Sequence, residues 1–175
     1  MTQAARGGVR AVKGETQVSG PTVCLTFRER AEEAIPFYVS LFRNSRILSM
    51  VRSDGTGPMP KGAVMQATFE LDGRQFVAFD GGPSFSFTDG ISLMVTCDTQ
   101  KDIDDLWAKL TEGGAEGPCG WLKDRFGVSW QIIPAELGKM LSDSKSGNAA
   151  KAMQAMLQMK KLDVATLKRA YESRA

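Results

Sequence analysis

The side chains able to perform chemistry are few in this chain, because none of its 175 residues is a histidine. A Cys-His pair or a Ser-His-Asp triad needs an imidazole base, so nucleophilic sites of both kinds are excluded. Three cysteines, Cys24, Cys97 and Cys119, lie in separate segments without a Cys-x-x-Cys pair. This spacing argues against a disulfide framework or a zinc ribbon. We expect the cysteines to be small hydrophobic residues buried in strands.

Carboxylates such as Asp80 and Glu70 remain the only candidates for acid–base chemistry, since a general base must be titratable. Two glycine clusters are candidates for a cofactor-binding loop. A dinucleotide or S-adenosylmethionine site of the Rossmann kind needs glycines between a parallel strand and a helix. Gly81-Gly82 leads into a segment that does not read as a helix, and Gly113-Gly114 follows a helix. Neither cluster favours such a cofactor.

Composition is that of an ordinary globular protein, with 42% hydrophobic and 24% charged residues. The length suits one compact domain or two small halves that share a core. A net charge of +2, with scattered basic residues, argues against a nucleic-acid partner. The apolar runs are too short for a membrane span. Residues 1–20 lack the apolar stretch of a secretory signal and are expected to form a flexible arm, so we expect a cytoplasmic protein.

Hydrophobic periodicity predicts a first round of elements after the arm. A helix at residues 30–43 has apolar residues at helical spacing. Asp72-Gly73 is a strong hairpin signal between two strands. A turn-rich loop covers residues 53–62. The expected strands are residues 22–28, 44–52, 63–71 and 74–80.

A second round repeats this order from residue 91. Residues 91–97 form a strand, and Asp98 or Thr99 caps a helix that ends at Gly113-Gly114. The inner face of this helix is expected to hold Ile103, Leu106, Trp107 and Leu110. A hairpin at residues 121–133 follows, and the pattern from residue 135 onward is helical. An apolar face of Met153, Met156 and Leu157 indicates core or subunit packing.

The shared order of the two rounds predicts an internal repeat. The first strands begin at Thr22 and Ile91, and the same spacing separates Leu41 from Leu110. We therefore expect an α+β fold of two βαβββ modules, at about residues 21–83 and 90–134, with a helical extension over residues 135–175.

Several segments resemble the PhnB-like branch of the glyoxalase, or vicinal oxygen chelate, superfamily, a branch often labelled 3-demethylubiquinone-9 3-methyltransferase. The most specific is Cys119–Pro134. The others are Ala31–Tyr38, Asp80–Pro83, Ile91–Leu93, Cys97–Asp98 and Lys160–Asp163. The resemblance spans about residues 21 to 173. It implies a glyoxalase/bleomycin-resistance-like fold whose modules form a curved sheet cup, completed in a homodimer.

The same resemblance locates the positions at which related enzymes hold a divalent metal. Gln131 stands where those enzymes place a glutamate ligand, and Val77 stands at the matching place of the first module. The histidine positions fall near Cys24 and Ser92. This set is poor for Zn²⁺, Ni²⁺ or Mn²⁺, which prefer imidazole and carboxylate ligands. We therefore expect a metal-free cup without a cofactor.

Strand alternation then predicts which side chains line the cup, provided that Gln131 faces it. The predicted binding residues are Cys24, Thr26, Val77, Phe79, Ser92, Met94, Ser129 and Gln131. Such walls suit a small, partly apolar organic ligand, although the same side chains could instead fill a closed core. Trp121 and Trp130 are expected in the core, and Asp124 with Arg125 is expected to shape the hairpin turn.

Three functions follow as hypotheses. The first is a small-molecule binding protein without turnover, the second a metal-independent enzyme of unknown reaction, and the third the methyltransferase of the family label. A homodimer is expected in each case, because one module leaves apolar sheet edges open.

Overall fold

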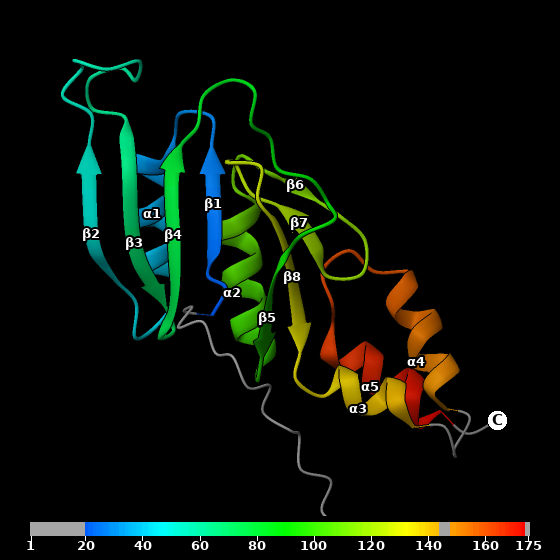
Figure 1. Ribbon diagram of the computed structural model, residues 1–175. Helices are drawn as coiled ribbons and strands as arrows, with labels where there is room; N and C mark the ends of the chain where they lie inside the picture. Colours follow the sequence, from blue (N-terminus) through cyan, green and yellow to red (C-terminus); the bar gives the residue numbers. More distant parts are fainter. Residues whose placement is uncertain (1–19, 144–147, 174–175) are drawn as a thin grey trace, which may run out of the picture.

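The computed structural model describes residues 20–143 and 148–173, and the chain forms two βαβββ modules followed by helices (Figure 1). The expected arm lies outside these residues except for Gly20. The first module contains β1 (Val23–Phe27), α1 (Ala31–Leu41), β2 (Arg46–Arg52), β3 (Val64–Leu71) and β4 (Arg74–Asp80). The second contains β5 (Leu93–Cys97), α2 (Gln100–Thr111), β6 (Ala115–Glu116), β7 (Trp121–Lys123) and β8 (Ser129–Pro134). The helices α3 (Leu137–Ser142), α4 (Asn148–Leu157) and α5 (Val164–Glu172) follow.

Each module builds a four-stranded sheet with the same strand order. The orders are β1-β4-β3-β2 and β5-β8-β7-β6. The first strand of each module runs parallel to the last, and the remaining pairs are antiparallel. This repeat confirms the predicted α+β fold and differs from a doubly wound parallel sheet. The two-residue strand β6 was not predicted, and β5 begins at Leu93 rather than at Ile91.

Local signals in the sequence explain where several elements begin and turn. Asp72 and Gly73 both adopt positive φ angles, of 48° and 74°, as a tight hairpin turn between β3 and β4 requires. Of the two candidate caps, Asp98 and Thr99, it is Thr99 that accepts a 3.1 Å hydrogen bond from the Asp102 amide at the start of α2. Helix α1 has no side-chain cap of its own. Its Ala31 amide instead donates to Asp80 Oδ1 at 2.9 Å, so the end of β4 caps the helix.

The helices α1 and α2 lie behind the two sheets in Figure 1, and one hydrophobic core joins both modules. Within β1 and β4, alternate side chains such as Leu25, Phe27 and Ala78 are buried in this core. Their neighbours in sequence therefore lie on the opposite, open face of the sheet. The largest fully buried side chains are Trp130, Tyr38, Phe27, Phe69, Ile35 and Ile103.

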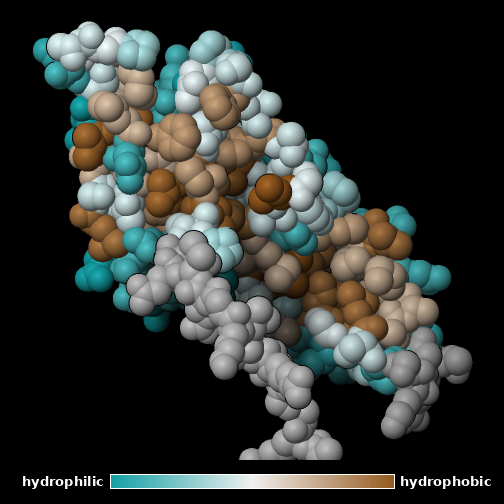
Figure 2. Space-filling view, in the orientation of Figure 1, coloured by the Kyte–Doolittle hydropathy of each residue, from teal (hydrophilic) through white to brown (hydrophobic). Residues whose placement is uncertain are grey.

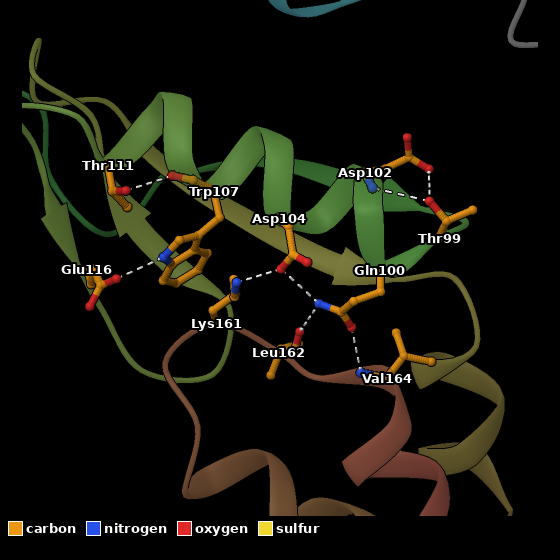
Figure 3. A network of polar contacts seen from close by, with 10 residues as sticks. All are labelled: Thr99, Gln100, Asp102, Asp104, Trp107, Thr111, Glu116, Lys161, Leu162 and Val164. Atoms are coloured by element: carbon orange, nitrogen blue, oxygen red, sulfur yellow. Dashed lines mark hydrogen bonds and ion pairs between the residues drawn. The ribbon is translucent and has the colours of Figure 1, made fainter.

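The C-terminal helices form a second, smaller core of Leu137, Met140, Ala152, Leu162 and Leu167. Polar contacts attach this unit to α2 (Figure 3). Gln100 donates to the Leu162 carbonyl at 3.2 Å and accepts from the Val164 amide at 2.8 Å. Lys161 forms an ion pair of 2.5 Å with Asp104. No helix among residues 20–143 and 148–173 is both long and apolar enough to cross a bilayer.

Candidate functional site

The strand registers place the predicted binding residues as two groups on the open faces of two different sheets. On the first sheet, Cys24 pairs with Val77 and Thr26 pairs with Phe79 across β1 and β4. Leu25 and Phe27 between them are buried, so this group points away from α1. No hydrogen bond or ion pair identified among the described residues joins this group to the second one.

On the second sheet, Met94 of β5 pairs with Gln131 of β8. The Gln131 amide donates to Ser92 Oγ, just before β5, at 2.8 Å, so Gln131 links two of the other predicted residues. Trp130 and Ile132 are buried on the other face, as alternation predicts. The register also shows which residue of the second module corresponds to Cys24. Cys24 pairs with Val77 of β4, and Met94 pairs with Gln131 of β8, so Met94 rather than Ser92 is the counterpart of Cys24.

The accessibility of these side chains corrects two expectations. Cys24 was expected to be buried and is exposed, whereas Cys97 is buried. Met94 is 62% exposed. Side chains this accessible do not fill a closed core, so these two positions of the open faces remain available to a ligand or to another protein surface.

A hollow of about 410 Å³ lies at the edge of the second sheet, beside β6, β7 and the start of β8. We call it the β7–β8 hollow. Its walls are Asp89, Ala115, Glu116, Gly117, Pro118, Trp121, Leu122, Lys123 and Ser129. Of the eight predicted binding residues, Ser129 alone belongs to this set.

Trp121 was expected in the core, but it is half-buried and lines the β7–β8 hollow. It pairs with Gln131, and Lys123 pairs with Ser129, across β7 and β8. Residues that pair directly across strands project from the same face. Extending the alternation from β8 to its neighbour strand would therefore have identified both Trp121 and Lys123.

One carboxylate oxygen at the edge of the hollow is contacted by two donor groups. Asp89 Oδ1 lies 2.9 Å from Lys123 Nζ and accepts a 3.1 Å hydrogen bond from Ser129 Oγ. These contacts, that of Lys123 first and then that of Ser129, lower the pKa of the Asp89 carboxyl. Glu116, on the opposite side of β7, accepts from Trp107 Nε1 at 2.9 Å and lies 3.4 Å from Lys160 Nζ. Its pKa is lowered by the same two partners, Trp107 first.

Asp124 is buried at the turn between β7 and β8, and it shapes that turn as expected. Its Oδ1 accepts from the Phe126 and Val128 amides at 2.8 and 3.1 Å. Its Oδ2 accepts from Tyr38 Oη at 2.7 Å and from Trp130 Nε1 at 2.8 Å. Burial, followed by the charge of Asp124, raises the pKa of Tyr38 well above its usual value. Each carboxylate oxygen accepts two hydrogen bonds from groups of the fold, so Asp124 is structural.

The two proposed acid–base carboxylates do not face the hollow. Asp80 is buried on the core side, where Oδ1 binds the Ala31 amide and Oδ2 binds the Val64 amide, both at 2.9 Å. Glu70 lies on β3 and forms a 2.9 Å ion pair with Arg46 of β2. Both carboxylates are occupied by structural partners, so neither is placed as a general base.

The residues at the family's metal-ligand positions do not make a metal site. Cys24 faces Val77, Met94 faces Gln131, and the Gln131 amide is bonded to Ser92. Divalent transition metals are held by groups of imidazole, carboxylate and thiolate ligands. Within residues 20–143 and 148–173, no three His, Cys, Asp or Glu side chains gather in such a group.

Comparison with known proteins agrees with this fold. A family model described as 3-demethylubiquinone-9 3-methyltransferase matches residues 19–133. The chain is 41% identical to a PhnB protein from Bacillus cereus, over 67% of this chain and 100% of that one, with a TM-score of 0.63. No curated protein matches the chain.

More distant solved structures share the fold. A protein from Pseudomonas aeruginosa is 23% identical, over 67% of this chain and 98% of that one, with a TM-score of 0.56. The fosfomycin resistance protein FosX from Listeria monocytogenes, complexed with Mn(II) and sulfate, is 12% identical. The match covers 75% of this chain and 100% of FosX, with a TM-score of 0.52.

Proposed function

Because this chain belongs to the 3-demethylubiquinone-9 3-methyltransferase family of the glyoxalase superfamily, we propose that it binds a small, partly apolar organic ligand on the open faces of its sheets without a metal ion. The observation that carries this proposal is the β7–β8 hollow, where Trp121 presents an aromatic wall beside the polar atoms of Lys123 and Ser129. Pockets that combine apolar walls with a few placed polar groups are typical of small-molecule sites.

The residues at the family's metal-ligand positions support a function that needs no metal. An amide that is already bonded to a serine stands in the place of the family's glutamate ligand, and the thioether of Met94 pairs with it across β5 and β8. In the first sheet the matching place holds a valine, Val77. Such groups bind Mn²⁺ or Zn²⁺ poorly. The function therefore depends on shape and hydrogen bonding, and no step is assigned to a metal-bound group.

The family's description as a methyltransferase receives no support from the glycine clusters. Gly81-Gly82 follows β4 and leads into an irregular segment, and Gly113-Gly114 follows α2. Neither stands between a parallel strand and the start of a helix, which is the arrangement of a Rossmann-type cofactor site. Binding without methyl transfer is accordingly the function that the residues favour.

A homodimer is part of the proposal, since residues 20–143 and 148–173 leave large apolar side chains exposed. Eight large exposed apolar side chains lie on the strands and on the segment that joins the modules, and two lie on α4. Figure 2 shows apolar surface over the strands and over the C-terminal helices. The strand-side set is Val23, Ile47, Leu48, Val51, Met65, Phe85, Ile91 and Met94, and the α4 set is Met153 and Leu157.

The experiment that tests this function is native mass spectrometry of the gently purified protein, with elemental analysis of the same sample after desalting. We expect a co-purified organic mass that is lost in Trp121→Ala and retained in Ile91→Ala, a control at a highly exposed apolar residue outside the hollow. About one Zn, Ni or Mn per chain would contradict the metal-free cup. Methyl transfer from added S-adenosylmethionine would favour the family label instead.

A further inference from the structure

Lys123 and Ser129 hold two hydrogen-bond donors in a fixed geometry at the edge of the β7–β8 hollow. The two residues pair directly across β7 and β8. Their side chains therefore stand together on the open face of the sheet. Ser129 is only 2% exposed, so its hydroxyl is set by the strands around it.

Both donors converge on a single oxygen, Oδ1 of Asp89, at 2.9 Å from Lys123 Nζ and 3.1 Å from Ser129 Oγ. Unlike its two partners, Asp89 lies outside the strands and is largely exposed. It lies in the irregular segment between β4 and β5, and its side chain is 72% exposed. An exposed carboxylate on a segment without regular structure can be displaced at small cost, because exposed ion pairs stabilise the fold by only about 0–1 kcal/mol.

From this geometry we infer that the β7–β8 hollow recognises an organic carboxylate with a flat apolar body, and that Asp89 occupies the place of the ligand's carboxylate until the ligand binds. The inference rests on the proposed ligand-binding function and names the class of ligand. The ligand's carboxylate would accept from Lys123 Nζ and Ser129 Oγ, while its apolar body would lie against Trp121. A charged acceptor receives stronger hydrogen bonds than a neutral one, so the two donors distinguish an anion from its neutral analogue.

The second carboxylate of the hollow does not compete for Lys123. Glu116 accepts from Trp107 Nε1 at 2.9 Å and is paired with Lys160 at 3.4 Å (Figure 3 shows its bond to Trp107). Lys123 therefore has Asp89 as its ion-pair partner within the described chain. A cationic ligand would instead have to separate Asp89 from Lys123 and leave the ammonium beside a second positive charge, which disfavours this alternative.

The test measures binding of matched probes by isothermal titration calorimetry: 2-naphthoate, neutral 2-naphthamide and a cationic 2-naphthyl trimethylammonium. We expect 2-naphthoate to bind the unmodified protein more tightly than the other two. Lys123→Met should weaken 2-naphthoate binding about tenfold, and Ser129→Ala should weaken it less, because each removes one donor to a charged acceptor. Asp89→Asn should strengthen it severalfold, since the competing charge is gone. Lys101→Met, at an exposed lysine on α2, serves as the charge-matched control.

The outcomes separate this inference from the proposed function. Equal binding of naphthoate and naphthamide, unchanged by Lys123→Met, would mean that the hollow takes apolar ligands but does not select carboxylates, and would overturn the inference alone. Tighter binding of the cationic probe than of 2-naphthoate would show that the hollow selects positive charge, and would also overturn the inference. If none of the three probes bound to the unmodified protein or to Asp89→Asn, the inference would be overturned. The proposed ligand-binding function would still be supported if native mass spectrometry found a co-purified organic mass. Thermal melts of each variant check that the fold is intact.

Discussion

The Tyr38 hydroxyl donates a 2.7 Å hydrogen bond to Oδ2 of Asp124, and this bond joins helix α1 of the first module to the β7–β8 turn of the second. Both residues are buried. The same carboxylate oxygen also accepts from Trp130 Nε1 at 2.8 Å. Asp124 thus fixes the packing of the two modules as well as the turn in which it lies.

Replacing Asp124 should therefore destabilise the whole chain. Asp124→Ala leaves the Tyr38 hydroxyl, the Trp130 indole N–H and two backbone amides without their acceptor. We expect a loss of roughly 3–5 kcal/mol in the free energy of unfolding, measured in urea. Asp105→Ala, which removes an exposed partner of Lys101, should change it by less than about 1 kcal/mol. An Asp124→Ala variant as stable as this control would contradict the role assigned to Asp124.

Asp80 should act on stability through its two backbone partners. An asparagine has one acceptor oxygen, so Asp80→Asn cannot satisfy both the Ala31 and the Val64 amides. The expected cost is about 1–3 kcal/mol of unfolding free energy. Glu70→Gln weakens an ion pair at the sheet edge and should cost less than about 1 kcal/mol. If ligand binding were lost in Asp80→Asn while stability stayed unchanged, Asp80 would belong to the site rather than to the fold.

Cys97 should make the protein less stable at alkaline pH. Burial, with smaller contributions from the charges of Asp102 and Asp98, raises the pKa of its thiol from 9.0 to about 11. The unfolded chain loses the thiol proton at lower pH than the folded chain, so this contribution is complete below pH 9 and is lost as the pH rises toward 11. The loss is on the order of 1–3 kcal/mol.

Urea unfolding at several pH values between 9 and 11 measures this effect. Cys97→Ala should show a shallower fall of stability with pH than the unmodified protein. Cys24→Ala, at an exposed cysteine, is the matched control. Equal slopes in the two variants would show that other groups cause the alkaline loss.

The dimer should depend on the exposed apolar side chains. Light scattering should give a mass twice the 19.0 kDa of one chain. Val51→Glu with Met65→Glu introduces charges at residues that are 55% and 50% exposed, and should shift the protein toward monomer. Met153→Glu with Leu157→Glu should weaken the dimer less, because α4 carries the smaller apolar set. A monomer mass for the unmodified protein at micromolar concentration would refute the dimer.

Much of the fold could be predicted because the signals are local. Alternation in β1, β4 and β8 separated buried from open-face residues, and the Asp72-Gly73 turn and the Thr99 cap marked element ends. Strand β6 was missed because two residues carry no periodicity. The α1 cap was missed because its acceptor, Asp80, comes from a distant strand.

The site was predicted less completely, for a related physical reason. Ser129 was identified from alternation along one strand, but Trp121 and Lys123 required the pairing of β7 with β8. Asp89 lies in a segment without a regular pattern, so its contacts with Lys123 and Ser129 depend on the path of the chain in space. The link from Tyr38 to Asp124 is likewise a tertiary contact that no local signal indicates.

The attachment of the C-terminal helices sets an order for assembly during synthesis on the ribosome. The Cys119 and Gly120 amides, at the entrance to β7, donate to the Met159 and Lys160 carbonyls, both at 2.7 Å. These acceptors emerge only after β8 and α4 have been made. The second module therefore reaches the exit tunnel's mouth with two amides still bound to water, and it is completed only when the segment before α5 docks on it. Nascent chains stopped after Pro134 should be more readily cleaved by protease at the β6–β7 connection than chains that extend through Glu172.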